Sequence, residues 1–269
     1  MKKIYFLMLT ALVLVPCCKT KNAVKALEEQ KMEEALLTEE ELKVNLDSLT
    51  ISLRKIKPVP FLSTESGAVV LSDKEKMIKP DYLADPTDAR NLPTLSQKYR
   101  ATAIYTVDRI VADLYDMPVS NYDEAIQRIG MELNDMAFYE VTRSLRADSN
   151  IGQIISNCAE KEYRAGRANF FWEATTAILV EQLFVCTRDV DKFMPMFDDE
   201  SAAEITNNFA LVHKGISSLV DFYPEMKSLE KVLEPLFLIN ADNADELRND
   251  LISIKNEISA IRGTFLENL

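Results

Sequence analysis

Residues 167–189 read RANFFWEATTAILVEQLFVCTRD, and this stretch decides the fold class. Between Phe170 and Thr187, only Glu173 and Glu181 carry a charge. A helix that is apolar on almost every side is a buried helix. The two glutamates and the lack of a basic flank argue against a membrane-spanning segment. We therefore predict that these residues form the central, buried helix of an all-α domain.

Most of the chain around this helix repeats apolar residues at steps of three and four, which is the spacing of one helical face. The stripes are Ile104, Val107, Val111 and Leu114; Ile126, Ile129, Leu133, Met136 and Val141; Ile151, Ile154, Ile155 and Cys158; Ile205, Phe209, Val212, Ile216 and Leu219; Met226, Leu229, Leu233 and Leu236; and Leu247, Leu251, Ile254, Ile258, Ile261 and Phe265. Each stripe predicts one amphipathic helix. Because the connections are short, residues 96–269 are expected to form an irregular multi-helix bundle of antiparallel helical hairpins.

Local signals agree with this helical interpretation. Four residue pairs have the spacing of an N-terminal capping box, namely Thr38 with Glu41, Ser72 with Glu75, Asn121 with Glu124, and Asn243 with Glu246. Only six glycines occur in the chain, too few for phosphate-cradling loops or the tight turns of a β-sandwich. The regular spacing of the last stripe also allows a coiled coil with another chain, although burial within the same domain is favoured.

Residues 39–95 combine one helix with a proline-rich irregular segment near 57–98. The helix is predicted from Leu42, Leu46, Leu49, Leu53 and Ile56, with a strand around residues 49–53 as the alternative. Prolines at 58, 60, 80, 86 and 93 remove backbone donors and interrupt regular structure. A short helix is expected to begin at Ser72 and to end before Pro80. Tyr82 and Leu83 should fix the rest of the segment onto the bundle.

The N-terminus has the pattern of a secretory signal. Lys2 and Lys3 precede a run from Ile4 to Val15 that is apolar except at two positions. As a helix, this run would span roughly 18 Å, which is too short to cross a hydrocarbon core of about 30 Å. Residues 1–17 are therefore predicted to be a signal peptide and are excluded from the fold.

Cys17 and Cys18 follow the apolar run directly. This arrangement resembles the lipobox of bacterial lipoproteins, in which a cysteine with an aliphatic residue three positions before it receives a lipid. For Cys18, the preferred site, that residue is Val15; for Cys17, the alternative, it is Leu14, with the rigid Pro16 at the cut. The other interpretation is an ordinary secretory signal with incidental cysteines.

The resemblance implies a protein that is held at a membrane by its N-terminal lipid. Several acyl chains on one cysteine give stable anchoring, which a single chain does not. Lys19 stands where an aspartate would signal retention in the inner membrane, so the resemblance implies the outer membrane, facing the periplasm. The charged residues 18–38 are expected to form a tether or solvated helix between this anchor and the domain.

The charge of the chain excludes one class of partner. The formal net charge is −12, and removal of Lys2 and Lys3 with the signal peptide leaves −14. A negative protein repels nucleic acid and anionic headgroups, so we expect no nucleic-acid binding. Attachment to a membrane must then come from lipid rather than from a basic patch.

The sequence holds no recognisable catalytic or metal motif. His213 is the single histidine, and neither a His-Glu-x-x-His pattern nor a Gly-x-Ser-x-Gly elbow occurs. Cys158 and Cys186 lie 28 residues apart. A hairpin that turns near Gly166 would offset them by about 18 Å, so they are predicted to be unpaired core residues, whereas a turn near Trp172 would allow a disulfide. We expect no metal and no cofactor.

These observations favour a non-enzymatic, outer-membrane-anchored lipoprotein that serves as an accessory or scaffold and binds a protein partner of the cell envelope. The alternative is a helical module that binds a small ligand or a glycan, and an enzyme with an unrecognised site is the third hypothesis. The candidate ligand or partner region consists of Phe170, Phe171, Trp172, Tyr82 and Leu83. An aromatic cluster on a buried helix is also what an ordinary core contains.

Overall fold

The computed structural model describes residues 40–44, 48, 71–144, 158–159 and 161–267. The chain separates into two units, Met1–Asn45 and Leu46–Leu269. In the first unit, the described residues 40–44 are helical. The predicted signal peptide with Cys17 and Cys18, the 18–38 tether, most of the stripe from Leu42 to Ile56, and the helix expected around Ile151 lie outside the described residues.

The prediction of an all-α fold is confirmed. The described part of the second unit contains α2 (Asp73–Lys76), η2 (Pro86–Asn91), α3 (Leu95–Leu114), α4 (Ser120–Leu133), α5 (Met136–Ser144), α7 (Ala168–Arg188), α8 (Val190–Phe193), η3 (Met194–Met196), α9 (Asp199–Leu219), α10 (Met226–Phe237), α11 (Ala244–Ser253) and α12 (Lys255–Leu266). No strand occurs among these residues. The antiparallel orientation of neighbouring helices stays a prediction.

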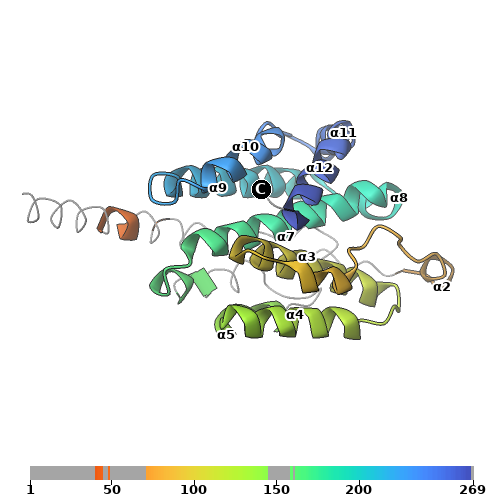
Figure 1. The fold of residues 1–269 in the computed structure, drawn as a ribbon. Coiled ribbons are helices and arrows are strands. Elements are labelled where there is room, and N and C mark those ends of the chain that lie inside the picture. Colours follow the sequence, from red (N-terminus) through yellow and green to blue (C-terminus); the bar gives the residue numbers. More distant parts are fainter. Residues whose placement is uncertain (1–39, 45–47, 49–70, 145–157, 160, 268–269) are drawn as a thin grey trace, which may run out of the picture. The chain divides into compact units, whose positions relative to one another are not determined.

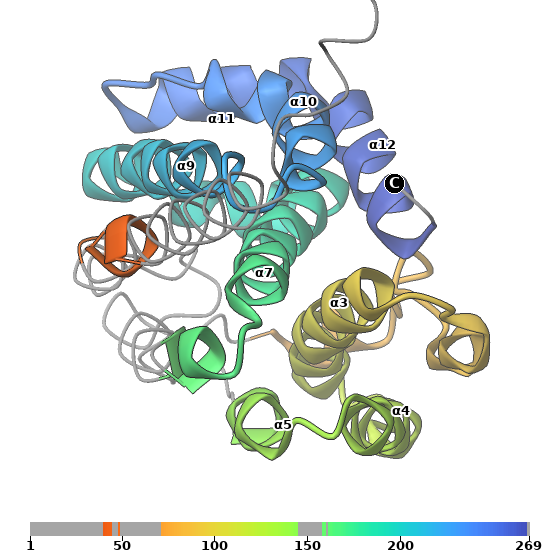
Figure 2. The same ribbon diagram turned by 60° about the vertical axis from the view of Figure 1, so that its left-hand side comes forward.

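The helices of the second unit lie in three layers. Figure 2 shows α4 and α5 in one layer, α3 and α7 in the middle, and α9 to α12 in the third. The contact between α3 and α7 is the most extensive between any two elements, and α12 packs on both of them. Figure 1 shows α7 passing through the middle of the unit.

Helix α7 is the buried centre that its apolar sequence predicts. Every residue from Phe171 to Thr187 is buried. Within the described ranges, no helix combines the length and apolar composition that crossing a membrane requires. Helix α3 is buried far more widely than its predicted stripe, since every side chain from Tyr99 to Ala112 is covered. Only Leu114, the last member of that stripe, is half-buried.

The helix predicted to start near Ser120 or Asn121 and to carry the stripe from Ile126 to Val141 is two helices, so the predicted stripe is wrong at its centre. Asn134 adopts the left-handed conformation with φ 49°, which ends α4. The Asp135 Oδ1 atom then accepts the Phe138 backbone N–H at 3.0 Å, so Asp135 begins α5 as its cap. Met136 is consequently 56% exposed instead of buried.

Two of the four predicted capping pairs are confirmed, and the pair at Thr38 lies outside the described residues. Ser72 and Glu75 form a complete capping box at α2, and the Asn243 side chain accepts the Glu246 N–H at the start of α11. The pair at Asn121 is wrong, because α4 begins one residue earlier and its Val119 cap has no side-chain hydrogen bond.

The third layer contains the stripes that the sequence predicts. All five stripe residues of α9 and all four of α10 are buried, from Ile205 to Leu219 and from Met226 to Leu236. The last stripe is divided between α11 and α12, because the backbone at Ile254 leaves helical geometry (φ −104°, ψ 17°). Leu251 and Ile258 on either side of this break are both fully buried, so the stripe packs within the chain's own domain.

Candidate functional site

The aromatic residues Phe170–Trp172, predicted as a ligand or partner region, begin helix α7. Phe171 and Trp172 leave only 4% and 2% of their surfaces exposed. A Cβ atom added at Gly215 of α9 would lie 2.5 Å from the Trp172 ring, so the indole packs directly on the α9 backbone. Phe170 stacks on Tyr99 of α3 with ring centroids 5.3 Å apart. Trp172 therefore joins α7 to α9, Phe170 joins α7 to α3, and the rings of Phe171 and Trp172 are closed to solvent.

Tyr82 and Leu83, the other part of that region, lie near the opposite end of α7. The Tyr82 hydroxyl donates to Asp189 Oδ2 at 3.1 Å, and its ring packs edge-on against Phe184 with centroids 6.0 Å apart. Leu83 is half-buried. Phe184 follows Phe170 by 14 residues on one helix, or about 20 Å along the axis. The structure therefore does not bring the two parts together, and their binding role stays a prediction.

A polar cluster around Asp189 attaches the segment before α3 to the end of α7. The Tyr115 hydroxyl donates to Asp189 Oδ2 at 2.6 Å, and Lys192 Nζ donates to the Tyr115 hydroxyl at 2.7 Å. Burial is the main cause that raises the pKa of Tyr82 and Tyr115, with the Asp189 charge adding to it, so both phenols are neutral donors at physiological pH. Each polar group here has a partner, which indicates a structural role.

The two glutamates of α7 each meet an arginine from another helix. Glu173 Oε2 lies 2.5 Å from Arg100 Nη1 of α3, and Ser96 donates to its other oxygen at 2.9 Å. Burial raises the pKa of Glu173 although Arg100 opposes the shift. Glu181 Oε2 lies 3.0 Å from Arg262 Nε of α12. The charges in this apolar helix thus connect it to specific neighbours, because a buried charge needs a partner.

A second carboxyl group shares the arginine of α12. Asp108 Oδ2 lies 3.5 Å from Arg262 Nη2 and accepts the Ala84 backbone N–H at 2.8 Å. Asp108 and Glu181 are both fully buried. Burial, followed by the charge of Glu181, raises the pKa of Asp108 well above its ordinary value. Two carboxyl groups beside one guanidinium are stable when one of them keeps its proton.

Another buried carboxyl pair lies between α5 and residues 158–167. The Tyr99 hydroxyl donates to Asp135, and Arg167 Nη1 lies 2.9 Å from Asp135 Oδ2. Glu162 is 1% exposed and accepts a weak hydrogen bond from the Cys158 thiol at 3.8 Å. Burial and then the adjacent Asp135 raise the pKa of Glu162 to about 8. Glu162 can therefore hold a proton at neutral pH.

Cys158 and Cys186 are both free and buried. The prediction that they are core residues is confirmed. Burial is the first cause that raises the pKa of each thiol above its ordinary value, so neither is a ready nucleophile. Among the described residues, no three His, Cys, Asp or Glu side chains are arranged to hold a metal ion.

An exposed groove of about 490 Å³ lies between α10 and the α11–α12 break. We call it the α10–α12 groove, and its lining consists of Lys231, Val232, Glu234, Pro235, Leu238, Ile239, Asp250, Ser253, Ile254 and Glu257. Leu238 is 77% exposed, whereas the stripe residue Leu236 two positions before it is fully buried. Three carboxylates and one lysine surround the apolar part of the groove. The groove thus combines an apolar surface with an excess of acidic side chains.

Sequence reasoning missed the α10–α12 groove, although one signal for it exists. Residues 232–239, which run from the end of α10 to two residues beyond it, read VLEPLFLI, so apolar residues continue outside the Met226–Leu236 stripe. Apolar residues on a second face of a helix indicate a second contact. The break at Ile254, which opens the other wall of the groove, has no comparable signal.

No model of a known protein family matches the chain, and comparisons with the curated proteins and with the solved structures found no match. The function must therefore be argued from the residues and their geometry.

Proposed function

We propose that this protein is a lipid-anchored, non-enzymatic accessory protein of the outer membrane, facing the periplasm, that binds a protein partner through the α10–α12 groove. The lipobox-like cysteines Cys17 and Cys18 support the anchor. The observation that carries the binding role is the groove itself, in which Leu238 is 77% exposed beside an acidic rim. A large apolar side chain that is kept in water is typical of an interaction surface when it belongs to a wider apolar patch.

The groove's composition selects the chemistry of the partner. Val232, Pro235, Leu238 and Ile254 offer an apolar surface on two helical segments, as a groove that receives an amphipathic helix does. Glu234, Asp250 and Glu257 outnumber Lys231 around it. Opposite charges across an interface favour association and orient the partner. The partner segment is therefore a cationic amphipathic helix, with apolar residues on one face and Lys or Arg beside them.

Site-specific crosslinking in the native membrane tests the proposal. A photoreactive phenylalanine analogue at Leu238 of the full chain should crosslink one envelope protein through a peptide rich in Lys or Arg. The same analogue at Met131 of α4, which is 71% exposed, is the matched control and should not capture that protein. The double variant Glu234→Lys/Glu257→Lys should lower the crosslinking yield at Leu238 about tenfold, because it reverses the charge of the rim.

The same experiment, carried out on cysteine variants, also tests the lipid anchor. Cys18→Ser should release the protein from the membrane fraction and abolish the crosslink, whereas Cys17→Ser should leave both unchanged; the reverse outcome would make Cys17 the lipidated residue. Identical crosslinks from Leu238 and Met131, or a captured peptide that is acidic, would refute the partner role. Membrane retention of the double variant Cys17→Ser/Cys18→Ser would refute the anchor.

A further inference from the structure

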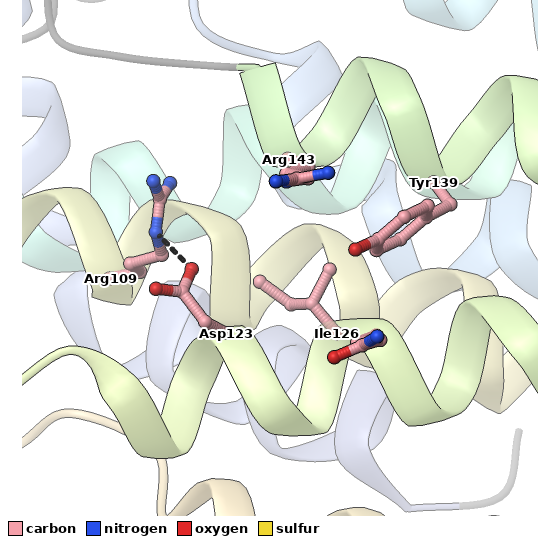
Figure 3. Close-up of a pocket in the computed structure, with 6 residues that line it drawn as sticks. Arg109, Asp123, Ile126, Tyr139 and Arg143 are labelled. Atoms are coloured by element: carbon pink, nitrogen blue, oxygen red, sulfur yellow. Dashed lines mark ion pairs between the residues drawn. The ribbon is translucent and has the colours of Figure 1, made fainter.

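A polar cleft of about 340 Å³ lies between α4 and α5, in a different layer from the α10–α12 groove. Its lining consists of Asp123, Ile126 and Gln127 from α4, Tyr139 and Arg143 from α5, and Arg109 from α3. Figure 3 shows Arg109 at one end of the cleft. Three helices thus contribute polar side chains to one cavity. Convergent polar groups in a concave site are a general feature of small-ligand sites.

One arginine of the cleft is buried and ion-paired. Arg109 is 7% exposed, and its Nε atom lies 2.8 Å from Asp123 Oδ1, as the dashed line in Figure 3 marks. The Asp123 carboxylate therefore keeps an ion pair with Arg109 at the edge of the cavity. A buried arginine has less conformational freedom to lose than an exposed one when it binds an anion.

The other wall supplies a second guanidinium and a hydroxyl. Figure 3 shows the Arg143 guanidinium and the Tyr139 hydroxyl extending from α5 on the same side of Ile126. A Cβ atom added at Gly130 of α4 would lie 3.0 Å from the Tyr139 ring, so the glycine permits α5 to place this ring directly on α4. The position of the Tyr139 hydroxyl is therefore set by close helix packing rather than by a mobile loop.

The charge of the cleft is opposite to that of the chain. Two arginines and one aspartate line it, whereas the chain carries a formal net charge of −12. A locally positive cavity in a negative protein favours anions at that point. Guanidinium groups bind phosphate and carboxylate oxygens with short, charge-assisted hydrogen bonds.

We propose that the cleft binds the phosphate or carboxylate group of a small polar molecule. Arg109 and Arg143 contact the oxyanion, Tyr139 donates a further hydrogen bond, and Asp123 acts as a positioning residue for Arg109. Because Asp123 is also an anion, it opposes ligand binding while it holds Arg109 in place. These two arginines are residues that the sequence alone does not single out.

The test is a binding titration of the full chain in neutral detergent with inorganic phosphate and, separately, succinate. Arg143→Gln should weaken binding of at least one anion about tenfold, the loss of one charge-assisted hydrogen bond. Asp123→Asn should tighten it, because the competing carboxylate is removed. Arg164→Gln removes an exposed arginine outside the cleft and should change nothing.

A second arm distinguishes a free anion from a lipid headgroup. If Arg143→Gln weakens the binding of phosphate or succinate in solution, the ligand is a free small molecule. If it instead weakens only binding to vesicles that contain phosphatidylglycerol, the ligand is a headgroup. Equal binding by the parent chain, Arg143→Gln and Asp123→Asn in both arms would overturn the proposal. Crosslinking from Leu238 is independent of these variants, so the two proposals can fail separately.

Discussion

The helices between residues 95 and 188 and those between 199 and 253 belong to the same unit but are stabilised differently. In the first region, α3 and α7 bury charged side chains, including Arg100, Asp108, Glu173 and Glu181. In the second region, the described part of α9, α10 and α11 buries no charged side chain. Apolar stripes join the helices of the second region. The first region adds ion pairs that connect particular residues.

The difference has a physical consequence for how each region is specified. Apolar burial is non-directional, so an apolar stripe specifies its partner less strictly than a paired charge does. A buried carboxylate must reach its partner or remain uncompensated. Glu173 pairs with α3 and Glu181 pairs with α12, so the two glutamates of α7 have different partner helices. We infer that these pairs determine which helices adjoin α7 and in which register.

Loss of Arg262 should have the largest effect on stability. Arg262→Ala leaves Asp108 and Glu181 buried together without their cation. Breaking a buried pair by removing one partner costs about 3–5 kcal/mol. We expect a decrease of that size in the free energy of unfolding measured with denaturant. Lys255→Ala, an exposed residue of the same helix, is the control and should change it little. An equal, small effect of both variants would remove the distinction between the two regions.

Gly215→Ala should have a smaller effect, and it tests the contact between the regions. The added methyl group would lie 2.5 Å from the Trp172 ring, which α7 and α9 hold between them. Overpacking of this kind costs about 1–3 kcal/mol. Gly263→Ala is the matched control, because no atom lies within 4 Å of the Cβ position there. Unfolding curves of both variants provide the comparison. Equal curves would show that the Trp172 ring can move away from the added methyl group without strain.

The region with apolar stripes is the one that could be predicted from the sequence. Periodicity identifies the buried faces of α9 and α10, and the Asn243 cap marks the start of α11. These signals lie within one helix or one turn, so they are readable without tertiary information. The apolar helix α7 is predictable for the same reason.

The ion pairs and the candidate sites could not be predicted in the same way. Arg100 and Glu173 lie 73 residues apart, and Glu181 and Arg262 lie 81 apart, so no local spacing connects them. The α10–α12 groove depends on where α11 ends. The break at Asn134 is a partial exception, because Asn-Asp is a turn signal that the apparently continuous stripe concealed.

Glu162 belongs to the charged region and gives the most local test of it. Its carboxyl group is surrounded by Asp135, Cys158, Arg167 and Tyr99, and its pKa is about 8 against 4.5 unfolded. The native state therefore binds this proton more tightly than the unfolded state does. The stabilising contribution is fully present below pH 4.5 and is lost as the pH rises through 8.

We expect the unfolding free energy to fall between pH 5 and 8, with up to about 1.4 kcal/mol per pH unit due to this one group. Glu162→Gln imitates the neutral acid and should remove that share of the slope, measured by denaturant unfolding at several pH values. Glu140→Gln changes an exposed carboxylate of α5 and should leave the slope as it is. If both variants keep the parent slope, the Asp135–Glu162 pair does not hold a proton at neutral pH. Both carboxyl groups would then be buried in their charged form.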